Sequence, residues 1–508
     1  PAAIMLGCGS WIPKRYIICF LCFLGMMITY IMRFCLSIAI TEMVVSYSRN
    51  TTGQVAPGTC PYDDDGSSKS IHTDRGEFIW SEQTQGIVLS SFFWGYVITQ
   101  VPGGLLAERF GGKYTLGGAI LVPSICSLLT PLAARQGVWY LVGLRIIMGL
   151  GQGFVYPSLN ALLAKWAPLE ERGRLGTLVF AGANFGNIVS NSLSGLLLSW
   201  TEGMWSVLFY LYGGAALIWL WLWVMFGYSK PEDHPGLSSS ERKYLEKYSA
   251  QVHMQKKLPP TPWRGILTSV PLWGLVVAQI GHDWGLFTIV TDLPKYMKTV
   301  MHFSIAQTGV RAALPYVAMC VVALFAGGLV DFLLAKKITS ITASRKIFTT
   351  VASLGPAVGI VGASYAECDK QTVTLFFILG MGLMGFFYPS LKVNCLDLSP
   401  NYAGTVMALV NGIGAISGII TPYLVGLLIP DNTMEQWRDV FWIAAAVLLL
   451  TNLVYVCTAS GEVQPWNEPL VPADHEAHKH GVKMTQLFDD LTVHDPHLGF
   501  RKTKKETY

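Results

Sequence analysis

The chain has 508 residues, of which 52% are hydrophobic and only 13% are charged, and its mean hydropathy is +0.42. Soluble globular domains carry about 25% charged residues, so the composition excludes an ordinary soluble protein. The formal net charge of +4 says little by itself, and we expect no nucleic-acid partner. The totals indicate a protein that crosses the membrane many times.

Windows of roughly 20 apolar residues mark the helices that can cross a bilayer. Twelve such windows follow one another, at 16–46, 84–107, 114–133, 138–164, 176–199, 205–227, 268–294, 305–330, 346–366, 371–394, 403–429 and 437–459. The expected fold is an all-α membrane protein with twelve transmembrane helices. We divide it into a cytoplasmic N-terminus (1–15), a six-helix bundle (16–227) with an outside loop (47–83), a cytoplasmic linker (228–264), a second six-helix bundle (265–459) and a cytoplasmic tail (460–508).

Lysine and arginine gather in alternate loops, and the positive-inside rule then puts both termini in the cytoplasm. The outside loop 47–83 contains the sequon Asn50-Thr51-Thr52, which is a candidate for N-glycosylation. Cys60 and Cys368 fall in predicted outside loops and could pair. The visible tails hold no acidic dileucine signal, which favours the plasma membrane over a lysosomal or vesicle membrane.

The stretch Val138–Leu175 is an apolar span with one internal charge, Arg145, and several glycines. An arginine in hydrocarbon costs roughly 2.5–3.5 kcal/mol on insertion scales, so it persists where it faces a protein interior or a watery cavity. Glycines allow neighbouring helices to approach closely. We expect an anion to meet Arg145.

An internal repeat supports two related halves. Tyr156-Pro157-Ser158-Leu159 recurs as Tyr388-Pro389-Ser390-Leu391, and a proline follows each at the same spacing. Parallel six-helix repeats are typical of one family of secondary transporters, with the substrate site between the halves.

The stretch Gly104–Lys113 resembles the loop motif of the major facilitator superfamily, although Glu108 replaces the usual aspartate and Gly112 stands where a basic residue is common. The resemblance implies a cytoplasmic latch built from Glu108, Arg109 and Asp331.

Further motifs resemble the anion–cation symporter family, which includes sialin, the vesicular glutamate transporters and the sodium–phosphate cotransporters, and insect members labelled as inorganic phosphate cotransporters. They are Ser91–Tyr96, Lys165–Pro168 with Glu171-Arg172, and the loop containing Asp331, Lys337, Arg345 and Lys346. The family implies the major facilitator fold and a symporter of anions, coupled to sodium or protons, with no other cofactor. We expect a monomer whose partners are the lipid bilayer and a small anion.

Arg33 and Arg145 match the family's arginines in the first and fourth spans. Two guanidinium groups facing one cavity suit an anion, because each can fork onto carboxylate or phosphate oxygens. Tyr30 and Tyr96 could add hydroxyl groups to the cavity wall or could simply pack. The arginines could instead satisfy helix carbonyls or an internal carboxylate.

The chain departs from the family at several charged positions. Leu89 stands where the vesicular glutamate transporters carry a histidine, which argues against glutamate. Met148 and Gln152 stand where proton-coupled members carry acids. His282 and Asp283 are then the candidates for coupling, because an imidazole beside a carboxylate in an apolar span has perturbed protonation.

Asp292 and Lys295 lie nearer the outside and are candidates for a gate. The predicted function is symport of inorganic phosphate or an organic anion by alternating access. The alternatives are sialin-like, proton-coupled export of acidic sugars or other organic acids, and a transporter-like receptor that moves nothing. A channel is disfavoured because it needs no paired halves, and no nucleotide-binding motif is present, so we expect neither a pump nor an enzyme.

Overall fold

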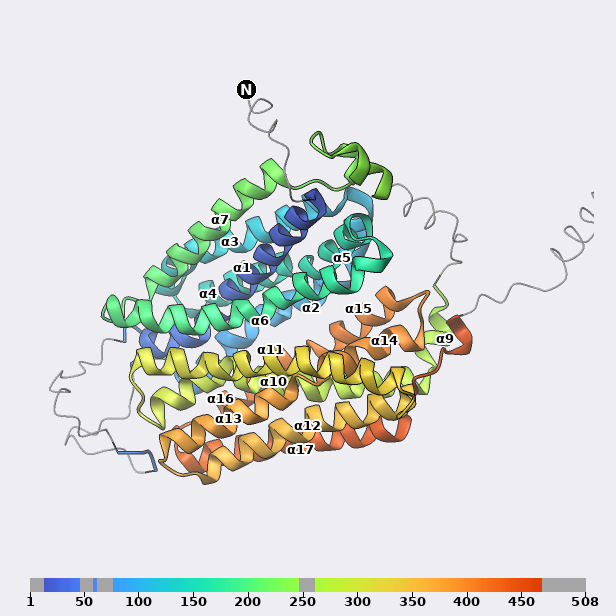
Figure 1. The fold of residues 1–508 in the computed structure, drawn as a ribbon. Helices are drawn as coiled ribbons and strands as arrows, with labels where there is room; N and C mark the ends of the chain where they lie inside the picture. Colours follow the sequence, from blue (N-terminus) through green and yellow to red (C-terminus); the bar gives the residue numbers. More distant parts are fainter. Residues whose placement is uncertain (1–12, 46–57, 62–75, 246–260, 468–508) are drawn as a thin grey trace, which may run out of the picture.

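We describe the protein from a computed structural model, which describes residues 13–45, 58–61, 76–245 and 261–467. The helices form two bundles that lie side by side, one from each half of the chain (Figure 1). We call them the N-terminal half, from α1 to α7, and the C-terminal half, from α10 to α17.

Seven helices make the N-terminal half. They are α1 (Lys14–Met43), α2 (Glu82–Phe110), α3 (Gly112–Gln136), α4 (Val138–Gln152), α5 (Val155–Trp166), α6 (Leu169–Trp200) and α7 (Ser206–Phe226). The fourth span consists of α4 and α5, which are separated only by Gly153 and Phe154. This half therefore supplies six spans.

The C-terminal half follows the same plan. Its elements are α10 (Val270–Thr299), α11 (Ile305–Ala335), α12 (Ile341–Tyr365), α13 (Lys370–Met384), η2 (Tyr388–Lys392), α14 (Val393–Leu398), α15 (Ala403–Gly414), α16 (Ser417–Leu428) and α17 (Met434–Thr458), preceded by the short α9 (Trp263–Leu267). One span consists of α13, η2 and α14, and the next consists of α15 and α16. Twelve spans result across the described part of the chain, as the sequence predicts.

Side-chain caps fix several helix starts. Ser81 accepts a hydrogen bond from the Thr84 amide at the start of α2, and capping boxes begin α11 and α17 at Ser304 and Thr433. Such caps satisfy backbone N–H groups that the first turn leaves free. Polar residues can therefore occupy the first turns, and for this reason several helices extend beyond their predicted apolar windows. The largest difference is α6, which begins at Leu169 rather than near residue 176, although its N-cap residue Pro168 makes no side-chain hydrogen bond.

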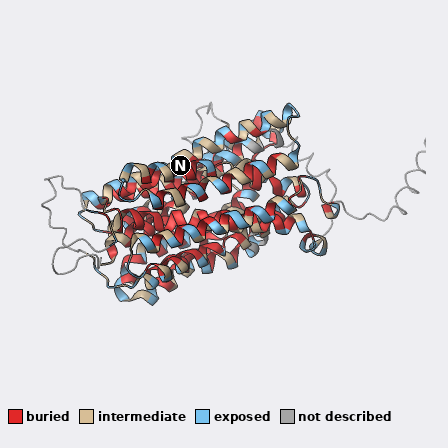
Figure 2. Cartoon of the chain, turned by 90° about the horizontal axis from the view of Figure 1, so that it is seen from below, coloured by how far each residue is buried: buried red, intermediate tan, exposed pale blue. Residues whose placement is uncertain are grey.

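The outward faces of the bundles are apolar. Of the described spans, nine are long and apolar enough to cross a membrane. Buried residues concentrate between the helices, while exposed residues lie on their outer surfaces (Figure 2). Large apolar side chains among the exposed ones, such as Trp139, Ile218, Leu324 and Phe325, provide the surface that lipid tails cover.

In the described part of the chain, four helix pairs make the main contacts between the two halves: α1 with α10, α2 with α15, α2 with α16, and α6 with α11. Between α6 and α11, a methyl group on Gly309 would lie 2.7 Å from the Cα atom of Gly195. On α2, a methyl group on Gly86 would lie 2.5 Å from the Pro422 carbonyl oxygen. These glycines permit close backbone contact. All of them lie toward the end of the bundle that carries the 47–83 loop, which we call the outer end.

The internal repeat reappears in the helix breaks. The helix α4 ends before Gly153, and α13 ends before Gly385, its counterpart in the repeat. The two halves differ in the turn that follows. Tyr156–Leu159 belongs to the α-helix α5, whereas Tyr388–Lys392 forms the π-helical turn η2.

Candidate anion site

Arg33 lies in the middle of α1 and is 4% exposed. Its Nε donates a hydrogen bond to Oε1 of Gln152 at 3.0 Å. Its guanidinium lies 4.7 Å from the ring centroid of Tyr30 and 4.4 Å from that of Tyr96. Aromatic faces attract a cation, so the rings hold this charge in place inside the protein.

Arg145 on α4 reaches the same region and is also 4% exposed. Its Nη2 donates to the carbonyl oxygen of Arg33 at 3.3 Å, and its guanidinium lies 5.2 Å from the ring centroid of Phe92. Close packing of α4 on α2 makes this possible, because a side chain at Gly149 would collide with the Phe92 carbonyl oxygen. The two predicted arginines therefore lie together.

Neither arginine is neutralised by a carboxylate among the residues that the structure describes. Nη2 of Arg33 and Nε of Arg145 are buried without a hydrogen-bond partner. Removing a charged group from water costs several kcal/mol unless an opposite charge or hydrogen bonds compensate. The site therefore carries excess positive charge and free N–H donors, which are the groups that bind an oxyanion.

A cavity lies beside the two guanidiniums and touches both halves. Its lining comes from α1, α2, α4 and α10, and consists of Arg33, Phe34, Ser37, Leu89, Phe93, Arg145 and Thr291. A cavity between halves is where an alternating-access transporter binds its substrate. Leu89 is one of its apolar walls.

Tyrosine hydroxyl groups extend the site toward the C-terminal half. The hydroxyl groups of Tyr30 and Tyr156 lie 2.9 Å apart, and Tyr388 lies 3.3 Å from the amide nitrogen of Asn184 on α6. Sequence reasoning named Tyr30 and Tyr96 but missed Tyr156 and Tyr388. The repeated Tyr-Pro-Ser-Leu motif could have found both, because each copy places its tyrosine at the boundary.

His282 and Asp283 are both buried on α10, but they do not act on one another. The imidazole of His282 stacks on the ring of Phe387, with centroids 3.3 Å apart. The carboxylate of Asp283 accepts a hydrogen bond from Nε2 of Gln279 at 2.8 Å, and it attracts Lys392. Neighbours on a helix point about 100° apart, so they meet different partners.

The outer end is closed by ion pairs between the halves. Lys295 on α10 pairs with Glu82 on α2, and Lys298 pairs with Glu42 on α1. The predicted gate residue Asp292 is buried, and it accepts a hydrogen bond from Thr291 at 2.6 Å rather than pairing with Lys295.

The opposite end has ion pairs that stay within one part of the chain. Nε of Arg345 lies 2.7 Å from Asp397 within the C-terminal half, and Nε of Arg15 lies 2.9 Å from Glu171 within the N-terminal half. Of the predicted latch, Arg109 and Asp331 are exposed, and the side chain of Glu108 lies outside the described residues. Among the described ion pairs, those that join the halves therefore all lie at the outer end, so this conformation is closed there.

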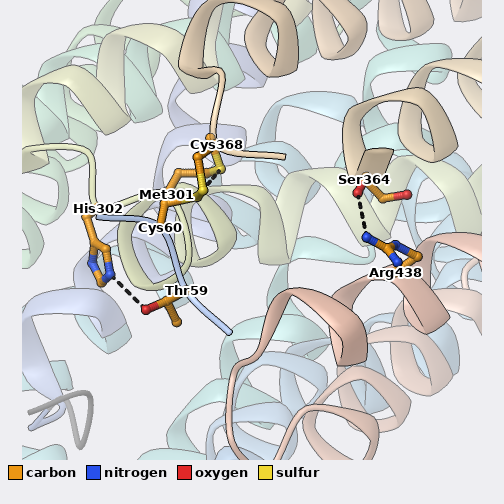
Figure 3. Close-up of a disulfide and its surroundings, with 7 residues drawn as sticks. All are labelled: Thr59, Cys60, Met301, His302, Ser364, Cys368 and Arg438. Atoms are coloured by element: carbon orange, nitrogen blue, oxygen red, sulfur yellow. Dashed lines mark hydrogen bonds between the residues drawn. A yellow bond between two sulfur atoms is a disulfide. The ribbon is translucent and has the colours of Figure 1, made fainter. Parts of the chain in front are cut away.

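A disulfide also joins the halves at the outer end. Cys60, in the 47–83 loop, is bonded to Cys368, between α12 and α13, and the two Cα atoms are 5.4 Å apart (Figure 3). Nearby, the imidazole Nε2 of His302 lies 3.2 Å from Oγ1 of Thr59, and the Cys60 amide donates to the Val300 carbonyl oxygen at 3.0 Å. The pairing that the sequence left open is present. The sequon at Asn50 lies outside the described residues.

Comparison with known proteins agrees with this architecture. Residues 22–422 match the model of the Major Facilitator Superfamily, and the chain belongs to that superfamily of membrane transporters. In fold it is similar to a bacterial homolog of the human lysosomal transporter Spinster, with a TM-score of 0.65 at 12% identity, over 89% of this chain and 98% of that one.

The relatives narrow the family. A Drosophila melanogaster protein named "Putative inorganic phosphate cotransporter" is 39% identical over 90% of this chain and 86% of its own length. Human sialin is 36% identical over 92% of both chains. The protein is therefore a multi-pass transporter of the anion–cation symporter family, as the sequence motifs predict.

Proposed function

We propose that this transporter carries inorganic phosphate or an organic anion, such as an acidic sugar, by rocking its two halves about the site at Arg33 and Arg145. The observation that carries the proposal is the pair of buried guanidiniums without a carboxylate partner. The phosphate cotransporter and sialin are named for such anions, which supports the substrate class. Tyr30 and Tyr96 form the wall around Arg33.

Coupling to a cation gradient is the second part of the proposal. Gln152 stands where proton-coupled members carry an acid, and as a neutral amide it leaves the charge of Arg33 uncompensated. Asp283, buried and hydrogen-bonded to Gln279, is the carboxylate through which a proton or sodium ion acts. His282, stacked on Phe387, positions that part of α10. No other cofactor is needed for this mechanism.

Two gates alternate in this scheme. At the outer end, Lys295 with Glu82 holds the halves together, and the buried Asp292 lies one turn from that pair. At the inner end, Glu108, Arg109 and Asp331 close the halves when the outer pairs open. Charge pairs suit this task because each one stabilises closure without preventing its reversal.

The orientation follows from chemistry on both sides of the membrane. Disulfides persist in oxidising compartments, so the end with Cys60 and Cys368 faces the outside or a lumen. The basic loops then face the cytoplasm together with both termini. We place the protein in the plasma membrane, as a monomer with lipid as its other partner.

Uptake of labelled phosphate into cells expressing the protein tests this function. Outside sodium is replaced by choline, and outside pH is varied separately. Sodium-dependent phosphate uptake supports a phosphate cotransporter. Acid-stimulated uptake of sialic acid, without phosphate uptake, supports the sialin-like alternative, which the tyrosine hydroxyls of the site favour. Surface expression without uptake of either anion would overturn the proposal in favour of a receptor.

A further inference from the structure

Lys392 is a half-buried cation of the C-terminal half, separate from the arginine pair of the N-terminal half. It ends η2, the π-helical turn Tyr388–Lys392. At the matching position of the repeat, the N-terminal half has Asn160, which lies in a regular α-helix. Single π-turns within α-helices are rare and are frequent at functional sites. The C-terminal half thus departs from the repeat where it introduces a charge.

The ammonium group of Lys392 has one hydrogen-bond acceptor among the described residues and can donate further hydrogen bonds. Its Nζ donates to Oδ1 of Asn411 and lies 5.2 Å from the ring centroid of Phe387. Asp283 attracts it, while the carboxylate accepts its hydrogen bond from Gln279. A lysine has three N–H donors, and one amide oxygen engages only one of them. The remaining donors suit an anionic oxygen.

Polar groups lie on both sides of the boundary between Lys392 and Arg33. Tyr388 begins the same turn as Lys392, and its hydroxyl group accepts a hydrogen bond from the Asn184 amide of the N-terminal half at 3.3 Å. In the N-terminal half, the ring of Tyr30 lies 4.7 Å from the guanidinium of Arg33. Lys392 therefore belongs to a turn of the C-terminal half that contacts the N-terminal half.

We propose that Lys392 binds the transported anion from the C-terminal half, while Arg33 and Arg145 bind it from the N-terminal half. The inference rests on the proposed function and names one more substrate-binding residue. An anion with oxygens on several sides, such as phosphate or a hydroxylated carboxylate, can satisfy donors from both halves at once. Substrate binding would then draw the halves together, and Asp283 would compete with the anion for Lys392.

A different role for Lys392 is to neutralise Asp283 without touching substrate. The two roles give opposite results when both charges are removed. If the lysine only neutralises the carboxylate, adding Lys392→Gln to Asp283→Asn leaves the KM of Asp283→Asn unchanged. If the lysine binds the anion, the double variant has a higher KM than Asp283→Asn, because the missing donor is not replaced.

The experiment measures initial uptake of labelled phosphate and labelled sialic acid, using whichever anion the wild-type protein carries. Surface protein is quantified for the wild type, Lys392→Gln, Asp283→Asn and the double variant. Lys336→Gln, an exposed lysine at the end of α11, is the matched control and should keep the wild-type KM. We expect Lys392→Gln to raise the KM about tenfold to a hundredfold over the wild type, the usual effect of losing a charged hydrogen bond. The double variant should raise the KM by a similar factor over Asp283→Asn.

The outcomes separate the two proposals. A wild-type protein that carries neither anion overturns the proposed function, and this inference with it. Wild-type uptake with an unchanged KM in Lys392→Gln, or with a double variant whose KM equals that of Asp283→Asn, leaves the function standing and overturns the role of Lys392. If Lys392→Gln does not reach the surface, Lys392→Met preserves the length of the side chain and its contact with Phe387, and gives the same comparison.

Discussion

Lys295 of α10 is paired with Glu82 of α2, and the two side chains belong to different halves of the transporter. The pair is reinforced on both sides, because Lys295 also donates to Gln85 at 2.9 Å and Asn432 donates to Glu82 at 2.6 Å. In both inter-half ion pairs the base comes from the C-terminal half and the acid from the N-terminal half. The outer closure is therefore an electrostatic contact between complementary surfaces.

Glu82→Gln should weaken that closure and raise access to the central site from outside. A cysteine at Ser37, which lines the cavity, would report access through its labelling by a membrane-impermeant thiol reagent. We expect labelling about fivefold faster, since an ion pair of this kind is worth about 1 kcal/mol. Glu77→Gln is the control, because Glu77 pairs with Arg135 within the N-terminal half. Equal labelling of both variants would show that Glu82 does not hold the gate.

Arg145→Ala should abolish anion uptake and leave surface expression intact. The buried guanidinium supplies free donors to the site, and alanine offers none. Arg135→Ala, which removes an exposed arginine at the outer end, should keep normal uptake. The measurement is uptake per surface molecule, and normal uptake in Arg145→Ala would rule out the proposed site.

The disulfide should hold the two halves together after the linker is cut. We would insert a protease site into the linker 228–264, cleave the purified protein, and compare gels with and without reductant. One band without reductant and two with it are expected, because Cys60 and Cys368 belong to different halves. Cys60→Ser should give two bands in both lanes. Two bands from the parent without reductant would contradict the pairing.

Asn50→Gln should increase gel mobility by removing one glycan. The residue stands in a sequon in the same loop as the disulfide cysteine Cys60, so it faces the compartment in which glycans are added. Enzymatic deglycosylation of the wild type is the control and should give the same shift. An unchanged mobility means that the sequon is unused or that the loop faces the cytoplasm.

Acidification should destabilise the outer end through His302. Burial, and secondarily the charge of Lys370, lowers the pKa of His302 to about 4 from its ordinary value of 6.5. A lowered pKa means that the folded state favours the neutral imidazole, so this stabilisation is complete above pH 6.5 and is lost as the pH falls toward 4. The melting temperature of the wild type should fall as the pH drops over that range, and the melting temperature of His302→Gln should fall less. Parallel plots of melting temperature against pH for the two proteins would count against this role of His302.

The site residues that the sequence predicted were those with a charge inside an apolar window. Arg33 and Arg145 stand out because an arginine inside a span costs roughly 2.5–3.5 kcal/mol on insertion scales, and the structure places the two together. The repeat likewise predicted two related halves. His282 and Asp283 were also visible as charges, but which partner each would meet depends on neighbouring helices and could not be read from their adjacency.

The residues that the sequence missed lie near the ends of spans. Glu42, Glu82 and Lys298 look like ordinary flanking charges, and only the packing of α1 and α2 on α10 shows that they pair. Lys392 lies two residues before the end of the predicted apolar window 371–394, where a charge is expected at a membrane boundary. The span continues to Leu398, which moves the lysine from the edge into the interior. Contacts between distant segments are not encoded in a local hydropathy pattern.

The bond between Cys60 and Cys368 tethers the two halves without fixing the distance between them. Cys60 is fastened to the C-terminal half, and about 17 residues lead back from it to Met43 at the end of α1, enough chain to span roughly 60 Å when extended. The bond therefore leaves room for the proposed outer gate to open. Because the Cys60 amide also donates to the Val300 carbonyl oxygen, reduction of the disulfide would leave residues 58–61 held to the C-terminal half by hydrogen bonds alone.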